Sequence, residues 1–96
     1  MHTLSAKLTF HIHHADSLKD KLQVSRSLIE KTRRRFNLSV SEVDTQDVHR
    51  TLTLGIAVVS GEMSHAQNSF DEIIRFMENN PDAELARVEF LCEPFV

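Results

Sequence analysis

The sequence contains no tryptophan and no tyrosine, and its aromatic residues are six phenylalanines. It also has only one cysteine, two glycines and two prolines. The single cysteine, Cys92, excludes an internal disulfide, and its place in an apolar alternation predicts a buried strand residue. The two glycines, Gly55 and Gly61, are too few and too scattered to form the glycine-rich loop that cradles phosphates in nucleotide-binding proteins.

Long apolar runs are absent as well. No segment approaches the roughly 18 residues that a helix needs to cross a bilayer. The first four residues lack the basic-then-apolar layout of a signal peptide, so we expect a cytoplasmic protein without membrane contact. Hydrophobic residues make up 41% and charged residues 26% of the chain, which is typical of a folded globular protein. Its 96 residues suit a single domain over residues 1–96.

The spacing of apolar residues predicts six elements. Alternation over residues 4–12 predicts a half-buried strand, and similar patterns predict strands over 38–43, 51–59 and 86–92. Apolar residues at spacings of three and four predict helices over 17–36 and 63–77. Ser17 and Ser64 are interpreted as helix caps, and Asn37 as a left-handed residue that ends the first helix. The stripe expected to face the core of the first helix consists of Leu18, Leu22, Ser25, Ile29, Thr32 and Phe36.

The order strand, helix, strand, strand, helix, strand predicts an α+β protein with the ferredoxin-like βαββαβ fold. Its four-stranded antiparallel sheet would carry both helices on one face. The opposite face would then be solvated, paired with another subunit or used for binding. Gly55, Ala57 and Val59 in one row would let a second sheet approach closely. One hypothesis is therefore a protein-interaction module, with a homodimer formed through the open sheet face or an edge strand.

Charge is unevenly distributed. The first predicted helix holds seven of the eleven Lys and Arg residues, opposed by Asp20 and Glu30 alone, whereas the rest of the chain has four basic and twelve acidic residues. This asymmetry predicts a docking surface for a polyanion. The leading hypothesis is a non-enzymatic domain that binds the phosphate backbone of ribosomal or other structured RNA. The predicted contacts are Lys19, Lys21, Arg26, Arg33, Arg34 and Arg35. The alternative is a solvated helix face whose last cations favour the helix dipole.

Candidate catalytic and metal-binding groups are sparse, and each has a simpler interpretation. His11 and His13 share a strand face and could reach one ion, but they lack further ligands at a recognised spacing, so solvated histidines are expected. The acids Glu42, Asp44 and Asp47 are typical of a polar turn. We expect no enzyme active site, no metal and no cofactor. Four phenylalanines fall on core stripes and only Phe76 and Phe95 are uncommitted, so base stacking on the sheet is not expected.

Four segments resemble the YlxP-like family, small bacterial proteins of unknown function. They are SLKDK at 17–21, RRFNLSVSEV at 34–43, QD at 46–47 and LGIAVVS at 54–60. The resemblance covers nearly the whole chain and implies a ferredoxin-like fold. Its members are often encoded near transcription, translation-initiation and ribosome-maturation factors, which implies a ribosome-associated or RNA-binding accessory role. Two departures are Leu22, where the family often has a basic residue, and Val48-His49, where an aromatic commonly follows Gln-Asp.

Overall fold

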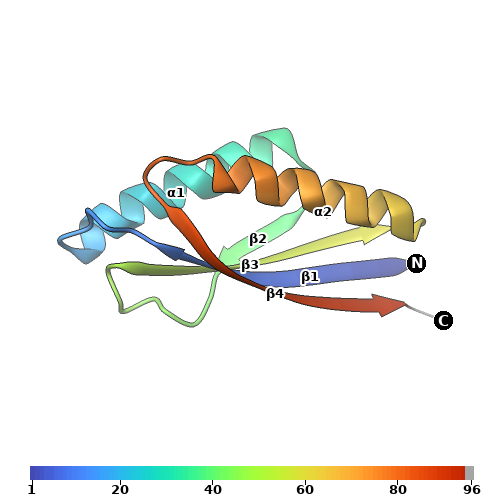
Figure 1. The fold of residues 1–96 in the computed structure, drawn as a ribbon, viewed down its shortest axis with the longest axis horizontal. Coiled ribbons are helices and arrows are strands. Elements are labelled where there is room, and N and C mark those ends of the chain that lie inside the picture. The colour runs from blue at the N-terminus through green and yellow to red at the C-terminus, as the bar shows by residue number, and fades with distance from the viewer. Residues whose placement is uncertain (95–96) are drawn as a thin grey trace.

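The computed structural model describes residues 1–94, and side chains as far as Leu91. Its elements follow the predicted order (Figure 1). They are β1 (His2–His11), α1 (Leu18–Arg35), β2 (Ser39–Glu42), β3 (Thr51–Ser60), α2 (Met63–Glu78) and β4 (Glu84–Pro94). The predictions for the Cys92 and Phe95 side chains lie outside the described residues.

The four strands form one antiparallel sheet in the order β2-β3-β1-β4. β1 pairs with β3 from His2↔Ser60 to His11↔Thr51, and with β4 on its other side, with a register shift between Thr9 and Phe10. Figure 1 shows both helices lying over the same side of the sheet. This arrangement confirms the predicted ferredoxin-like fold and leaves the second sheet face without a covering layer.

The core lies between the sheet and the helices. Alternate residues of the two central strands point into it, as their sequence predicted. These are Leu4, Ala6, Leu8 and Phe10 of β1 and Leu52, Leu54, Ile56 and Val58 of β3, all buried. α2 closes this layer with Ala66, Phe70, Ile73 and Met77, which recur at the predicted helical spacing.

The predicted core stripe of α1 is partly wrong. Leu18 and Leu22 are 48% and 45% exposed, whereas the buried residues of α1 are Lys21, Ser25, Leu28 and Thr32. At about 100° per residue, the direction that faces the core is rotated by roughly 50° from the predicted one. The polar members are accommodated by hydrogen bonds, since Thr32 Oγ1 donates to Leu28 O at 2.7 Å. The prediction therefore holds for Ser25 and Thr32, which are buried, and for Ile29 and Phe36, which pack partly buried against the core.

Several local predictions also change. α1 ends at Phe36 in an extended conformation, so Asn37 is not a left-handed cap, and Ser64 lies inside α2, which is preceded by Glu62. Phe90 is on the helix-facing side of β4 but is 62% exposed, because β4 is an edge strand. Phe76, which the sequence left unassigned, packs edge-on against Phe36 with ring centroids 5.6 Å apart.

Candidate functional site

The basic helix α1 begins at a well-formed cap. Ser17 Oγ accepts a hydrogen bond from the backbone N–H of Asp20 at 3.2 Å, and the Asp20 carboxylate accepts one from the N–H of Asp16 at 3.1 Å. The predicted cap at Ser17 is confirmed, while the Asp20 carboxylate bonds to the N–H of Asp16 and not to that of Ser17, as it would in a standard capping box. This cap fixes where the first turn begins.

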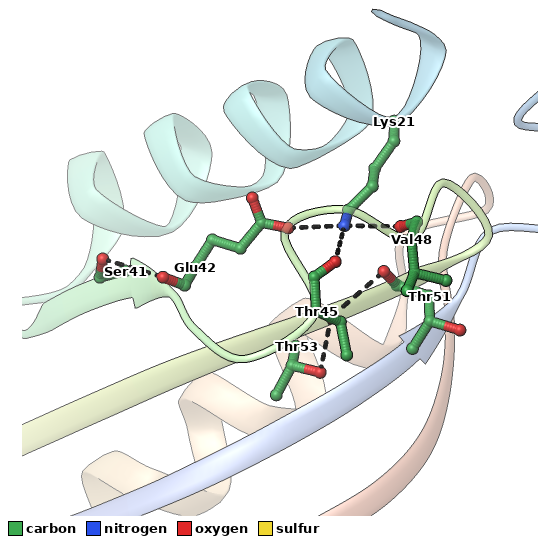
Figure 2. A network of polar contacts seen from close by, with 7 residues as sticks. All are labelled: Lys21, Ser41, Glu42, Thr45, Val48, Thr51 and Thr53. Carbon is green, nitrogen blue, oxygen red and sulfur yellow. Dashed lines mark hydrogen bonds and ion pairs between the residues drawn. The ribbon is translucent and has the colours of Figure 1, made fainter. Parts of the chain in front are cut away.

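Lys21 occupies a position that the sequence did not predict. Its side chain is 3% exposed, and its Nζ lies 2.8 Å from Glu42 Oε2. The same ammonium group donates to Thr45 O at 2.6 Å and to Val48 O at 2.7 Å (Figure 2). The two carbonyls accept hydrogen bonds from the ammonium group, and the carboxylate forms an ion pair with it. The prediction that Lys21 contacts phosphate is therefore wrong, because its charge is buried and fully partnered.

The oxygens around Lys21 come from β2 and from the connection between β2 and β3, as Figure 2 shows. Thr45 strengthens this connection, because its Oγ1 lies 2.9 Å from Thr53 Oγ1 and 3.3 Å from Thr51 O. Asp44 is the one non-glycine residue with positive φ among the described residues, at 63°. Backbone carbonyls have no sequence signature, so sequence reasoning missed this network. The available signal was the position of Lys21, which lies three residues after Leu18 and four before Ser25, on the side of the helix that was expected to face the core.

The other predicted cations remain outside the core. Lys19 and Arg26 are exposed and have no partner among the described residues. Arg34 has only Glu30 of its own helix at 4.0 Å, and both of these side chains are mostly exposed. We define the basic surface of α1 as Lys19, Arg26, Arg33, Arg34 and Arg35. Within the described part of the chain, no carboxylate from another element pairs with any of the five.

Two arginines of this surface make other contacts. Arg33 Nη2 donates to Val40 O of β2 at 2.9 Å. Arg35 stacks over two aromatic rings, with its guanidinium carbon 5.2 Å from the Phe76 centroid and 5.7 Å from the Phe36 centroid. Neither contact neutralises a charge, and both restrict the side chains. At the C-terminal end of α1, Arg33 and Arg35 therefore keep their positive charges, and their side chains are held in place by these contacts.

The rotation of α1 increases the exposure of its cations. With about 100° per residue, Lys19, Arg26 and Arg34 lie within roughly 50° of the direction opposite to the buried stripe. The sequence placed the first two beside the core contact instead. From Lys19 to Arg34 the helix rises by about 22 Å at 1.5 Å per residue. The outermost line of α1 thus carries three cations and one carboxylate, Glu30, over four turns.

The open sheet face is the second candidate site. Its middle is a shallow hollow of about 610 Å³, whose floor includes Ser5, Ser41, Gly55 and Ala57. A Cβ at Gly55 would lie 3.4 Å from Val43 Cγ1, so the glycine keeps this floor low. Val59 and Leu91 are 63% and 55% exposed on either side of β1. This face therefore combines small floor residues with two exposed apolar side chains.

Charged residues surround the hollow in pairs of opposite sign. Lys7 Nζ lies 2.7 Å from Asp44 Oδ2, and Arg87 Nε lies 3.5 Å from Glu89 Oε1. The hydrogen bond to Asp44 and the attraction of its charge raise the pKa of Lys7 above its ordinary value. The face as a whole is close to neutral.

The remaining candidate groups do not converge. His11 and His13 have ring centroids 6.0 Å apart, and His13 Nε2 lies 3.4 Å from Glu84 Oε1. Among the residues that the structure describes, no three His, Cys, Asp or Glu side chains gather as a metal site requires. Glu42 faces Lys21 while Asp44 faces Lys7, so the acids of the turn pair with different lysines. In the same described range, no helix is both long and apolar enough to span a membrane.

A family model described as "Protein of unknown function (DUF503)" matches residues 3–90. The chain belongs to this family. Over 73 residues it is 30% identical to "Uncharacterized protein YlxP" of Bacillus subtilis (strain 168), a match that covers 76% of this chain and 79% of that protein. These matches confirm the resemblance to YlxP-like proteins. The chain also resembles a solved structure, the de novo designed protein LFR1 1 with ferredoxin fold. The TM-score is 0.56 at 18% identity, covering 100% of this chain and 88% of the other.

The two departures from the family pattern lie on the surface. Leu22 was expected to face the core, where the loss of a basic residue would matter little. Because Leu22 is exposed on α1, this DUF503 family member lacks a cation there that would have extended its basic surface. Val48 is also exposed, while its carbonyl accepts from Lys21.

Proposed function

We propose that this protein is a cytoplasmic, non-enzymatic accessory domain that binds ribosomal or other structured RNA through the basic surface of α1. One observation carries the proposal: the cations of that surface have no carboxylate partner from another element among the described residues. The rest of the chain is net acidic, so an anionic partner is drawn to α1 and repelled elsewhere. Lys21 is not part of this surface.

The geometry favours recognition of phosphates over recognition of bases. Exposed Lys and Arg side chains on a helix can neutralise phosphates without reading sequence. Base stacking on a ferredoxin-like sheet requires aromatic residues on its open face. The open face has no Phe, Tyr or Trp among the described residues, since Phe90, the exposed phenylalanine of β4, is on the helix-facing side. We therefore expect binding that depends on the shape and charge of the RNA.

The pairing of the acidic residues supports a non-enzymatic role. General acid–base catalysis needs a titratable side chain that is free to reach a proton of the substrate. Glu42 is held against Lys21 beneath α1, whereas Asp44 pairs with Lys7 at the edge of the open sheet face. Their use in separate ion pairs favours a structural function for both.

The test measures binding to ribosomal RNA fragments and co-sedimentation with ribosomes at several salt concentrations. If all five cations contact phosphate, the log–log salt slope should be about −3.5 to −4.5. The variant Lys19→Glu, Arg26→Glu, Arg34→Glu should bind at least tenfold more weakly and show a shallower slope by two to three. Since all three side chains are exposed, its circular dichroism should match that of the wild type.

A single charge reversal on the other helix provides the control. Arg75 of α2 is exposed and unpaired among the described residues, as Arg26 is, so Arg75→Glu changes net charge by the same amount as Arg26→Glu. Only Arg26→Glu should weaken binding and flatten the slope. The proposal fails if the folded triple variant binds RNA and ribosomes like the wild type, or if both single variants have equal effects.

A further inference from the structure

We infer that the open sheet face is an interface between two copies of this chain. This inference is independent of the proposed RNA binding, because no residue of the basic surface of α1 lies on that side of the sheet (Figure 1). It rests on the shape, the extent and the charge balance of the face.

The shape of the face allows another sheet to approach. Ser41, Gly55, Ala57 and Ser5 come from β2, β3 and β1 and form the low floor of the hollow. Val59 and Leu91 stand on either side of β1, opposite Thr3 and Ser5 in the ladders. When two such faces meet across a twofold axis, Leu91 of one copy can enter the hollow above Gly55 of the second. Interdigitation of this kind fills the roughly 10 Å between packed sheets.

The extent of the face reaches the lower limit for a specific dimer. β1 and β3 have 10 residues each and β4 has 11, while β2 adds four. With about 3.3 Å per residue and about 4.8 Å between strands, the face covers roughly 550 Å². Two copies would bury about 1,100 Å², which is just above the roughly 1,000 Å² expected of a specific interface.

The charges identify a second copy as the occupant. In a twofold interface a surface meets itself, so it must contain both signs of charge. The open face has Lys7 and Arg87 with Asp44 and Glu89, each cation already beside an anion. Phosphate has little attraction for such a neutral surface. The basic surface of α1 would repel its own copy, so it cannot serve as this interface.

The experiment is sedimentation velocity of the purified chain over a range of micromolar concentrations. The wild type should sediment with twice the 11.0 kDa mass of one chain. Ala57→Arg places a long charged side chain on the floor, where it would be buried between two sheets but solvated in a monomer. It should raise the dimer dissociation constant at least tenfold. Leu91→Lys should also raise the dimer dissociation constant, because it replaces an exposed apolar side chain beside the hollow with a charged one.

Leu22→Lys is the matched control for Leu91→Lys. Leu22 and Leu91 have similar exposed fractions, but Leu22 lies on α1, so its replacement should leave the dimer unchanged. Circular dichroism verifies that each variant is folded. If Ala57→Arg does not fold, Leu91→Lys alone tests the interface. A monomeric wild type overturns the inference. So does a wild-type dimer that persists in the folded sheet-face variants, since another surface would then form it.

Discussion

Lys21 illustrates how the same residue type can serve opposite purposes within one helix. Lys19 and Lys21 are two residues apart, and at about 100° per residue their side chains differ in direction by roughly 200°. Lys19 points into solvent, whereas the ammonium of Lys21 is enclosed by Glu42, Thr45 and Val48. A buried cation of this kind stabilises a fold only while all its partners remain in place.

Replacing Lys21 tests this structural role. Lys21→Met keeps most of the aliphatic stem but leaves the partly buried Glu42 carboxylate and two carbonyls without their donor. We expect a loss of about 3 kcal/mol in the free energy of unfolding, at the low end for a broken buried ion pair because Glu42 remains partly exposed. Urea denaturation measures this difference.

Lys19→Met is the control, because it makes the same chemical change on the exposed side of the helix. It should alter stability by less than about 0.5 kcal/mol, as is usual for surface substitutions. Equal effects of the two substitutions would contradict the arrangement in Figure 2. The two substitutions should affect RNA binding in the opposite order, since Lys19→Met should lower the affinity for RNA more than Lys21→Met.

For α1 as a whole, the sequence predicted the helix and its N-terminal cap correctly but partly misplaced the side that faces the core. Leu18 and Leu22 defined the predicted stripe because large apolar residues are normally buried. The structure confirms the predicted burial of Ser25 and Thr32, but it places Leu28 and the stem of Lys21 against the core where Leu18 and Leu22 were expected. An amphipathic lysine carries no clear hydrophobic signal, so only the packed structure identifies its side of the helix.

Two truncations of the same type distinguish the observed orientation of α1 from the predicted one. Leu28 is 1% exposed, so Leu28→Ala should lower the free energy of unfolding by about 2–5 kcal/mol through lost burial and a cavity. Leu22→Ala should cost less than about 0.5 kcal/mol because the side chain is largely solvated. If α1 instead packed on its predicted stripe, the Leu22 substitution would be the costlier one in urea denaturation.

The strands could be predicted from the sequence, whereas the contacts that hold the connection between β2 and β3 could not. Alternation in β1 and β3 depends only on which side of a strand each residue occupies, so it can be read locally from Leu4 to Phe10 and from Leu52 to Val58. The connection between β2 and β3 is held by carbonyl oxygens around Lys21 and by hydrogen bonds of Thr45. The contacts of Lys21 join residues 24 and 27 positions apart, so no local pattern predicts them.

The basic surface of α1 and the open sheet face lie on opposite sides of the molecule. If both proposals hold, dimer formation should affect the affinity for RNA. In a dimer joined through the sheets, each α1 lies on an outer side. The sheets are about 10 Å apart and each helix layer is about 10 Å thick, so the two basic surfaces would be roughly 30 Å apart. An RNA that reaches both would bind with an effective concentration set by this distance, which strengthens binding without new contacts.

Binding measurements with two RNA lengths can detect this coupling. A hairpin too short to span about 30 Å should bind the wild type and Ala57→Arg equally, because each α1 acts alone. A longer structured RNA should bind the wild type about 100-fold more tightly than the monomeric variant, within the range of bivalent gains. In the variant Lys19→Glu, Arg26→Glu, Arg34→Glu, both RNAs should bind weakly while the dimer persists. A long RNA that binds the monomeric variant and the wild type equally would show that the two basic surfaces do not engage one RNA together.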